Sequence, residues 1–120
     1  MRWLTALLAA TLLTLAGCGS QTAPGTGGSD LPNIPAEFTP TPFKRGSIGM
    51  ARSSAPNSAN SQFFICYDGC GSLTGQYTLL GEVVAGQDVA DKIKKGSSAA
   101  NGQVTSPDKI VKMQLAADAR

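Results

Sequence analysis

The sequence predicts a mostly β domain with one short α-helix, placed behind an N-terminal export signal. Residues 61–67 (SQFFICY) are aromatic and β-branched, as strands are, and residues 109–117 (KIVKMQLAA) alternate apolar with polar side chains. Only residues 87–95 carry a helical pattern. The chain has 120 residues, which is enough for a single domain at most.

The composition excludes several classes of function. Ten Lys and Arg against eight Asp and Glu give a net charge of +2, which is too small and too scattered for a nucleic-acid-binding surface. The chain has no histidine, so it lacks the commonest general base and the commonest metal ligand. We therefore expect no metal, no cofactor and no nucleic-acid partner.

The N-terminus is typical of an export signal. Arg2 precedes an apolar stretch at 4–15, which is shorter than the roughly 20 residues needed to span a bilayer. The sequence LAGC at 15–18 resembles a bacterial lipoprotein box, in which cleavage before Cys18 leaves that residue lipidated. A plain signal peptide with a chance cysteine and an N-terminal anchor are the alternatives.

These features predict three segments: a lipoprotein signal peptide at 1–17, a tether at 18–24 and a domain at 25–120. The mature protein would be anchored by the lipid on Cys18 to the outer side of the cytoplasmic membrane. Because Gly19 follows the cysteine, the usual sorting rule would send the protein to an outer membrane where one exists.

The segment from 19 to 42 is rich in Gly, Ser, Thr and Pro and is expected to be extended and irregular, with Ile34 and Phe38 as docking points. Its GTGG sequence at 25–28 does not predict a phosphate-binding loop. No strand precedes it, no helix follows it, and no Lys–Ser/Thr pair closes it.

Three strands are expected in the middle of the chain. The first, at 47–51, places Ile48 and Met50 on one face, and Pro56 and Asn57 then favour a turn. The second, at 61–67, places Gln62, Phe64 and Cys66 on one face and Phe63, Ile65 and Tyr67 on the other. After a Gly-rich loop, the third strand covers 77–84 (YTLLGEVV).

A helix at 87–95 would bury Val89, Ala90 and Ile93. The pairs Asp88–Lys92 and Asp91–Lys95 have the i,i+4 spacing of ion pairs, and Gly96 stands where a left-handed C-cap belongs. The last strand, at 109–117, would place Val111, Met113 and Leu115 on one face.

Cys66 and Cys70 remain after Cys18 is assigned to the lipid. Their spacing is not that of a CxxC redox pair, and no second pair of ligands would complete a zinc site. The favoured interpretation is that both are packing or loop residues. A local disulfide is the alternative, because an exported protein can form one and Gly69 allows a tight turn.

Three segments carry a resemblance to a known family: FKRGSIGMARSSAPNSANSQFFICY (43–67), LTGQYTLLGEVVAGQDVADKI (73–93) and NGQV followed by PDKI (101–110). They resemble the bacterial branch of the cyclophilin-type peptidyl-prolyl isomerases, from about Gly25 to Ala117, and GTGGSD is similar to the family's Gly-rich segment. The resemblance implies a closed antiparallel β-barrel of eight strands capped by two helices, and rotation about X–Pro peptide bonds.

The resemblance also implies roles for six residues. Gln62 would hydrogen-bond the substrate backbone next to the proline, and Phe64 and Leu73 would form the floor and a wall of the proline pocket. Tyr77 would close the rim, and Ala51 and Arg52 would pair with the substrate backbone. Ser72 stands where several members have Trp, so the aromatic rim would be thinner.

The family's first strands and first helix have no counterpart in residues 1–30, so the expected barrel is incomplete. That part of the family carries the arginine that donates to the prolyl nitrogen, and neither Arg45 nor Arg52 is expected to replace it. We expect an exported isomerase that assists protein folding, with doubtful activity. The alternatives are a non-catalytic lipoprotein that binds proline-containing peptides or a partner, and a truncated remnant. The oligomeric state stays open.

Overall fold

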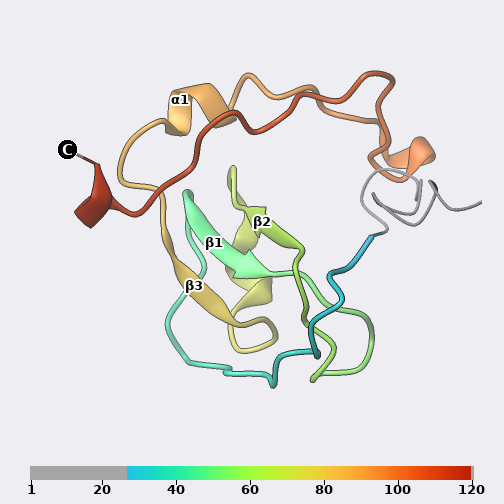
Figure 1. Ribbon diagram of the computed structural model, residues 1–120, viewed down its shortest axis with the longest axis vertical. Coiled ribbons are helices and arrows are strands. Elements are labelled where there is room, and N and C mark those ends of the chain that lie inside the picture. Colours follow the sequence, from blue (N-terminus) through green and yellow to red (C-terminus); the bar gives the residue numbers. More distant parts are fainter. Residues whose placement is uncertain (1–26, 120) are drawn as a thin grey trace, which may run out of the picture.

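The computed structural model describes residues 27–119, and at its centre lies a three-stranded antiparallel sheet (Figure 1). The strands are β1 (Ser47–Met50), β2 (Phe63–Ile65) and β3 (Leu79–Glu82), in the order β2-β1-β3. The prediction of a mostly β chain with one short helix is confirmed, with three strands in place of the eight of a full barrel. The predicted signal peptide, tether and Cys18 lie outside the described residues.

The three predicted central strands are shorter in the structure than in the sequence pattern, the first by one residue and the other two by more. Regular pairing covers only Phe63–Ile65 of the second strand and Leu79–Glu82 of the third. Single backbone hydrogen bonds continue each ladder, because the amide of Ala51 donates to the carbonyl of Gln62 at 2.9 Å and that of Val83 donates to Gly46 at 2.8 Å. A bulge between Ile48 and Gly49 interrupts the pairing with β3.

An aromatic cluster of Phe43, Phe64 and Tyr77 lies against Gly49 of β1. The rings of Phe43 and Phe64 stack at 5.7 Å, and Tyr77 meets Phe64 edge-on at 5.5 Å. A Cβ on Gly49 would lie 2.5 Å from Phe64 Cζ and 2.8 Å from Phe43 Cε1. The absence of a side chain at residue 49 therefore lets both rings pack directly on the strand backbone.

Cys66 and Cys70 form a disulfide. The favoured interpretation of both as unpaired packing or loop residues is wrong, and the alternative is confirmed. Gly69 adopts the left-handed conformation, with φ of 68°, and turns the chain so that Cys70 approaches the buried Cys66. The bond joins the end of β2 to the short 3₁₀ helix η1 (Cys70–Leu73).

The predicted helix is shorter than expected, because α1 covers only Gln87–Ala90. Beyond Asp91 the backbone bonds tighten to i−3 acceptors, and the amide of Ile93 donates to the carbonyl of Ala90 at 3.1 Å. Ala90 is buried as predicted, but Val89 is 63% exposed and Ile93 is 40% exposed, so the predicted apolar stripe is wrong at both residues. Within α1 only Ala90 is buried, Gln87 is half-buried, and Asp88 and Val89 are exposed.

The charges around α1 also pair differently from the sequence prediction. Neither of the two predicted i,i+4 ion pairs forms. Asp91 pairs instead with Arg45, which precedes β1. The ammonium group of Lys95 donates to the backbone carbonyl of Asp91 at 3.3 Å.

Gly96 is not a left-handed cap, because its φ is not positive. A Cβ on Gly96 would lie 2.2 Å from the backbone of Gly102, so this glycine permits a close approach of two chain segments.

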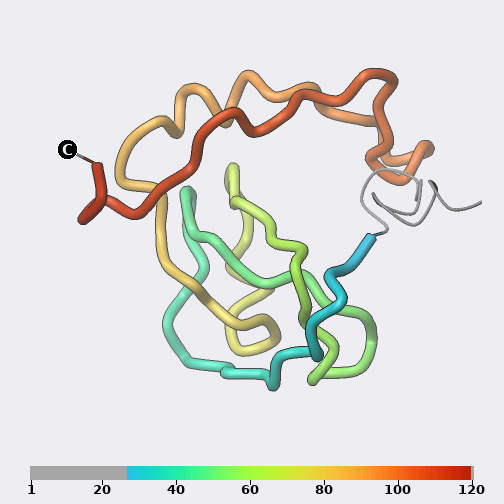
Figure 2. The backbone as a smooth tube through the Cα atoms, in the orientation of Figure 1, coloured from blue at the N-terminus to red at the C-terminus, as the bar shows by residue number. Residues whose placement is uncertain are grey.

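The prediction of a last strand at 109–117 is wrong. Residues 109–115 are irregular and end in a 3₁₀ helix η3 (Ala116–Asp118); a second such helix, η2, covers Ser98–Ala100. Val111 is 98% exposed. Within residues 27–119 no strand pairs with this segment, and an unpaired segment gains no ladder hydrogen bonds. The tube view shows it running past the α1 region without joining the sheet (Figure 2).

Candidate functional site

A surface groove of about 360 Å³ lies where β1 ends and β2 begins. It contains Ala51, Arg52 and Gln62, three of the six residues for which the sequence predicted a substrate role. Its other lining residues are Gly27, Gly28, Ser53, Ser58 and Asn60. The groove therefore combines the turn between the first two strands with the Gly-rich segment that precedes them.

The sheet itself holds the two sides of the groove together. Ala51 follows β1 and Gln62 precedes β2, so the antiparallel pairing of these strands brings the two residues side by side. The backbone bond between them, at 2.9 Å, continues the ladder into the groove.

The Gly-rich side of the groove is held by Asn60. Its amide oxygen accepts from the backbone N–H of Ser29 at 2.6 Å, and its amide nitrogen donates to the carbonyl of Leu31 at 3.0 Å. Farther along, Ile34 forms an isolated bridge with Ala59. Ile34 thus docks through its backbone alone, because its side chain is 43% exposed.

Gln62 is half-buried and reaches across the groove. Its Nε2 donates to the carbonyl of Gly27 at 2.5 Å. A primary amide has two N–H donors and one acceptor oxygen, so this bond leaves one donor and the oxygen available to a ligand. The contact also fixes the side chain, which lowers the entropy cost of ordering it when a ligand binds.

Arg52 is fixed by contacts on several sides. Its Nε and Nη2 donate to the carbonyl of Gln76 at 2.9 and 2.7 Å, and its Nη1 donates to the carbonyl of Ser53 at 3.0 Å. The guanidinium lies over the ring of Tyr77, 4.8 Å from its centroid, and near Phe38 at 5.5 Å. Phe38 thereby docks on the body of the protein, as its position in the sequence predicted.

The other three predicted site residues do not line this groove. Phe64 and Tyr77 belong to the aromatic cluster, where both are half-buried. Tyr77 reaches the groove indirectly, through the guanidinium of Arg52 above its ring. Leu73 ends η1 and is half-buried. The structure thus separates the predicted residues into a polar groove and a neighbouring aromatic cluster.

Sequence reasoning missed the hydroxyl and amide groups that shape the groove. Ser58 accepts from the N–H of Ser53 at 2.9 Å and donates to the carbonyl of Ala55 at 2.6 Å. The available signal was the Asn- and Ser-rich composition of 57–60, because these side chains often bond to nearby backbone in turns.

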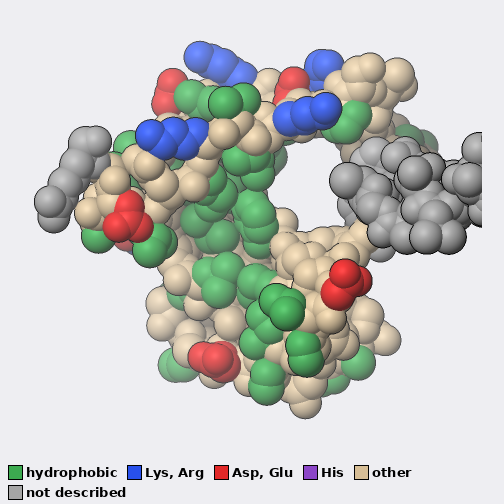
Figure 3. Space-filling model, in the orientation of Figure 1, with side chains coloured by type: hydrophobic (Ala, Val, Ile, Leu, Met, Phe, Trp, Pro, Cys, Tyr) green, Lys and Arg blue, Asp and Glu red, His purple; other side chains and the backbone are tan. Residues whose placement is uncertain are grey.

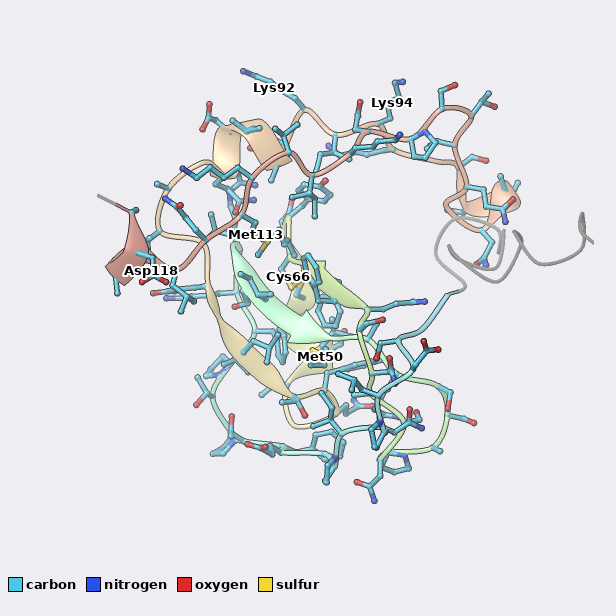
Figure 4. The ribbon with its side chains drawn as sticks, in the orientation of Figure 1. Met50, Cys66, Lys92, Lys94, Met113 and Asp118 are labelled. Atoms are coloured by element: carbon cyan, nitrogen blue, oxygen red, sulfur yellow. A yellow bond between two sulfur atoms is a disulfide. The ribbon has the colours of Figure 1, made fainter. Side chains whose placement is uncertain are left out.

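The groove and the sheet lie apart from the charged edge of the molecule. Lys92 and Lys94 point outward from the segment after α1, whereas Met50 and Cys66 lie at the sheet (Figure 4). In that outer region the hydrogen bond from Arg45 lowers the pKa of the Asp91 carboxyl, and the same bond raises the pKa of Arg45.

Within residues 27–119, no three Cys, Asp or Glu side chains are grouped so that they could hold a metal ion. None of the helices described is long and apolar enough to cross a bilayer.

The chain matches the family model described as cyclophilin type peptidyl-prolyl cis-trans isomerase/CLD over residues 13–115. The match begins before Gly25, inside the segment predicted as a signal peptide. It includes every residue of the groove and of the aromatic cluster.

Individual relatives agree with the family model. A protein of Brucella abortus (strain 2308) named probable peptidyl-prolyl cis-trans isomerase is 60% identical over 96 residues, covering 80% of this chain and 49% of the relative. Peptidyl-prolyl cis-trans isomerase B of Escherichia coli (strain K12) is 34% identical over 106 residues, covering 71% of this chain and 65% of the relative.

A probable peptidyl-prolyl cis-trans isomerase B of Mycobacterium leprae is 33% identical over 114 residues, covering 84% of this chain and 38% of the relative. The chain thus spans about half the length of the Brucella relative. The sequence resemblance, the sheet and the family match agree, and the chain belongs to the family of cyclophilin-type peptidyl-prolyl cis-trans isomerases.

Proposed function

We propose that this chain binds proline-containing segments in the groove and accelerates rotation about their X–Pro bonds. The observation that carries the proposal is the meeting of Ala51, Arg52 and Gln62 in one groove, inside a chain of this family. Ala51 and Arg52 lie just beyond the end of β1, where an extended peptide can pair with backbone groups. Gln62 supplies the side-chain amide.

The chemistry suits a groove without metal or histidine. Rotation about a peptide bond has a barrier of about 18–20 kcal/mol because it breaks amide resonance. The cis isomer is accessible mainly at X–Pro bonds. A protein that holds the twisted amide more tightly than either planar form lowers this barrier, and no nucleophile is needed. The aromatic cluster beside the groove offers apolar surface for the proline ring.

We also propose that the protein is exported and anchored by a lipid on Cys18, where it assists the folding of proline-containing proteins. The apolar stretch at 4–15 and the LAGC sequence at 15–18 support this location. Metabolic labelling with a radioactive fatty acid tests the anchor. Label should enter the native protein and be absent from Cys18→Ser.

A second candidate function is peptide binding without catalysis. Catalysis in this family relies on an arginine donor, and the structure describes two arginines. Arg45 donates to Asp91 and to the carbonyl of Tyr67, and all three guanidinium nitrogens of Arg52 donate to backbone carbonyls. Losing one preorganised donor typically costs about 10²–10³ in rate. These contacts favour binding with little acceleration.

NMR exchange spectroscopy on an Ala–Pro peptide separates the two functions. The isomerase proposal predicts cis–trans exchange cross-peaks that grow with protein concentration. An exchange rate equal to that of the free peptide, together with shifted peptide resonances, would reject catalysis and support binding alone. Unchanged shifts and rate would reject both functions.

The matched variant for this experiment is Gln62→Ala. It removes the side-chain amide from the groove and should weaken peptide binding by about fivefold to tenfold, since a hydrogen bond contributes about 1 kcal/mol. Leu80→Ala, on β3 outside the groove, is the control because its side chain is 56% exposed. Equal loss of binding in both variants would argue against the groove as the site.

A further inference from the structure

We propose that Arg52 makes the groove selective for proline-containing peptides with an acidic side chain next to the prolyl segment. This inference rests on the proposed function and names a substrate class for the same site. Within residues 27–119, eight residues line the groove, and Arg52 is the only charged one among them. A single uncompensated cation on a neutral surface favours a carboxylate over an ammonium group.

The charge of Arg52 is not neutralised by the residues around it. The two ion pairs among the described residues join Lys44 to Glu82 and Arg45 to Asp91. The partners of Arg52 are backbone carbonyls and aromatic rings, which orient the guanidinium but carry no net charge. Its positive charge therefore stays available to a ligand.

The acidic residues nearest in sequence do not cancel this charge. Asp30 and Glu37 belong to the extended segment that starts at the groove, and neither lines the groove or forms an ion pair with Arg52. In the space-filling view, Lys and Arg gather along the upper edge together with some acidic side chains, and other acidic side chains are scattered singly over the lower body (Figure 3). The field inside the groove is set by Arg52.

The position of Arg52 is also fixed well enough to discriminate between ligands. Two hydrogen bonds to the carbonyl of Gln76 and the ring of Tyr77 hold the guanidinium beside the end of β1. A charge held in place loses less side-chain entropy on binding than a mobile lysine does. Hydrogen bonds to backbone carbonyls use most of its donors, so the discrimination is mainly electrostatic and should be screened by salt.

The test uses three peptides that differ only in the residue two positions before proline, which is Glu, Gln or Lys. Their dissociation constants are measured by NMR titration with the whole chain at low salt. The Glu peptide should bind about fivefold more tightly than the Lys peptide, since a solvent-exposed charge pair contributes up to about fivefold. The preference should disappear in Arg52→Gln, remain in Arg52→Lys and fade at 0.5 M NaCl.

Lys109→Gln is the matched control, because it removes one positive charge from an exposed residue outside the groove. It should keep the native preference. Equal binding of the Glu and Lys peptides, or a preference that survives in Arg52→Gln, would overturn the inference while leaving the proposed function intact if the Gln peptide binds. If the Gln peptide neither binds nor isomerises, the proposed function fails and this inference fails with it.

Discussion

The groove region and the C-terminal segment both contain alternating apolar residues, but only the groove region forms strands among the described residues. Apolar side chains alternate or cluster within residues 47–65. Two parts of this range form the paired strands β1, which contains Gly49, and β2. Residues 109–117 also alternate, but they pair with nothing described, and Val111 is 98% exposed. Alternation predicts a strand only where another strand supplies hydrogen bonds.

The difference shows where the stability of this chain resides. Around the groove, Asn60 and Ser58 satisfy backbone groups of neighbouring segments, and aromatic rings pack on a strand. The C-terminal segment has few such contacts, so changes there should have small effects.

The largest effect on stability is expected at Gly49. In Gly49→Ala the new Cβ would meet two aromatic rings, at 2.5 and 2.8 Å, and both must move. Such overpacking should lower the free energy of unfolding by about 3 kcal/mol, the upper end of its usual range. Urea denaturation followed by circular dichroism measures it.

Gly81→Ala on β3 is the matched control. Its added Cβ has no neighbour within 4 Å, so its free energy of unfolding should stay within about 1 kcal/mol of the native value. Similar losses in both variants would show that the packing around Gly49 is not the cause.

Reduction of the disulfide should have the next largest effect. Cys66 and Cys70 are separated by 4 positions, and the chain-entropy model gives about 2 kcal/mol for so short a loop. The urea midpoint should fall when a reductant is added, and Cys70→Ser should show the lower midpoint with or without reductant. A native midpoint unaffected by reductant would contradict the bond.

A smaller effect should follow pH through Arg45 and Asp91. The bond from Arg45 lowers the pKa of Asp91 in the folded state, below its unfolded value of about 3.9. The unfolded state then binds more protons, so this stabilisation is complete above the unfolded pKa and is lost as the pH falls through the folded pKa.

Asp91→Asn removes this titration. The difference in unfolding free energy between the native protein and the variant should therefore shrink as the pH falls from 6 to 3. A difference that is constant over this range would show that the ion pair contributes nothing.

The smallest effect is expected in the C-terminal segment. Val111→Asp places a charge at a side chain that is 98% exposed, so the free energy of unfolding should change by less than about 0.5 kcal/mol. A loss above about 2 kcal/mol would mean that this segment packs in solution and that the contrast between the two regions is wrong.

The sequence predicted the centre of the fold better than its edges. The runs at 47–51 and 61–67 contain true strands because each supplies the other's partner. The length of the helix at 87–95 was overestimated, and the pairing of Asp91 with Arg45 was missed because no local spacing reveals a contact between distant segments.

The candidate site residues were named through the family resemblance rather than through local patterns, and their substrate roles stay predictions. Ala51, Arg52 and Gln62 meet in one groove, because strand pairing places the end of one strand beside the start of the next. The fixing of Arg52 by Gln76 and Tyr77 could not be predicted, since it depends on how a later loop folds back.

The central claim is that the groove at Ala51, Arg52 and Gln62 is the site that binds proline-containing peptides. Chemical-shift mapping with an isotope-labelled chain and an Ala–Pro peptide tests it most directly. The largest shifts should fall on the backbone amides of 51–53 and on the side-chain amide of Gln62, with none at 109–119. Shifts that are largest at 109–119, or spread evenly over the chain, would contradict the claim.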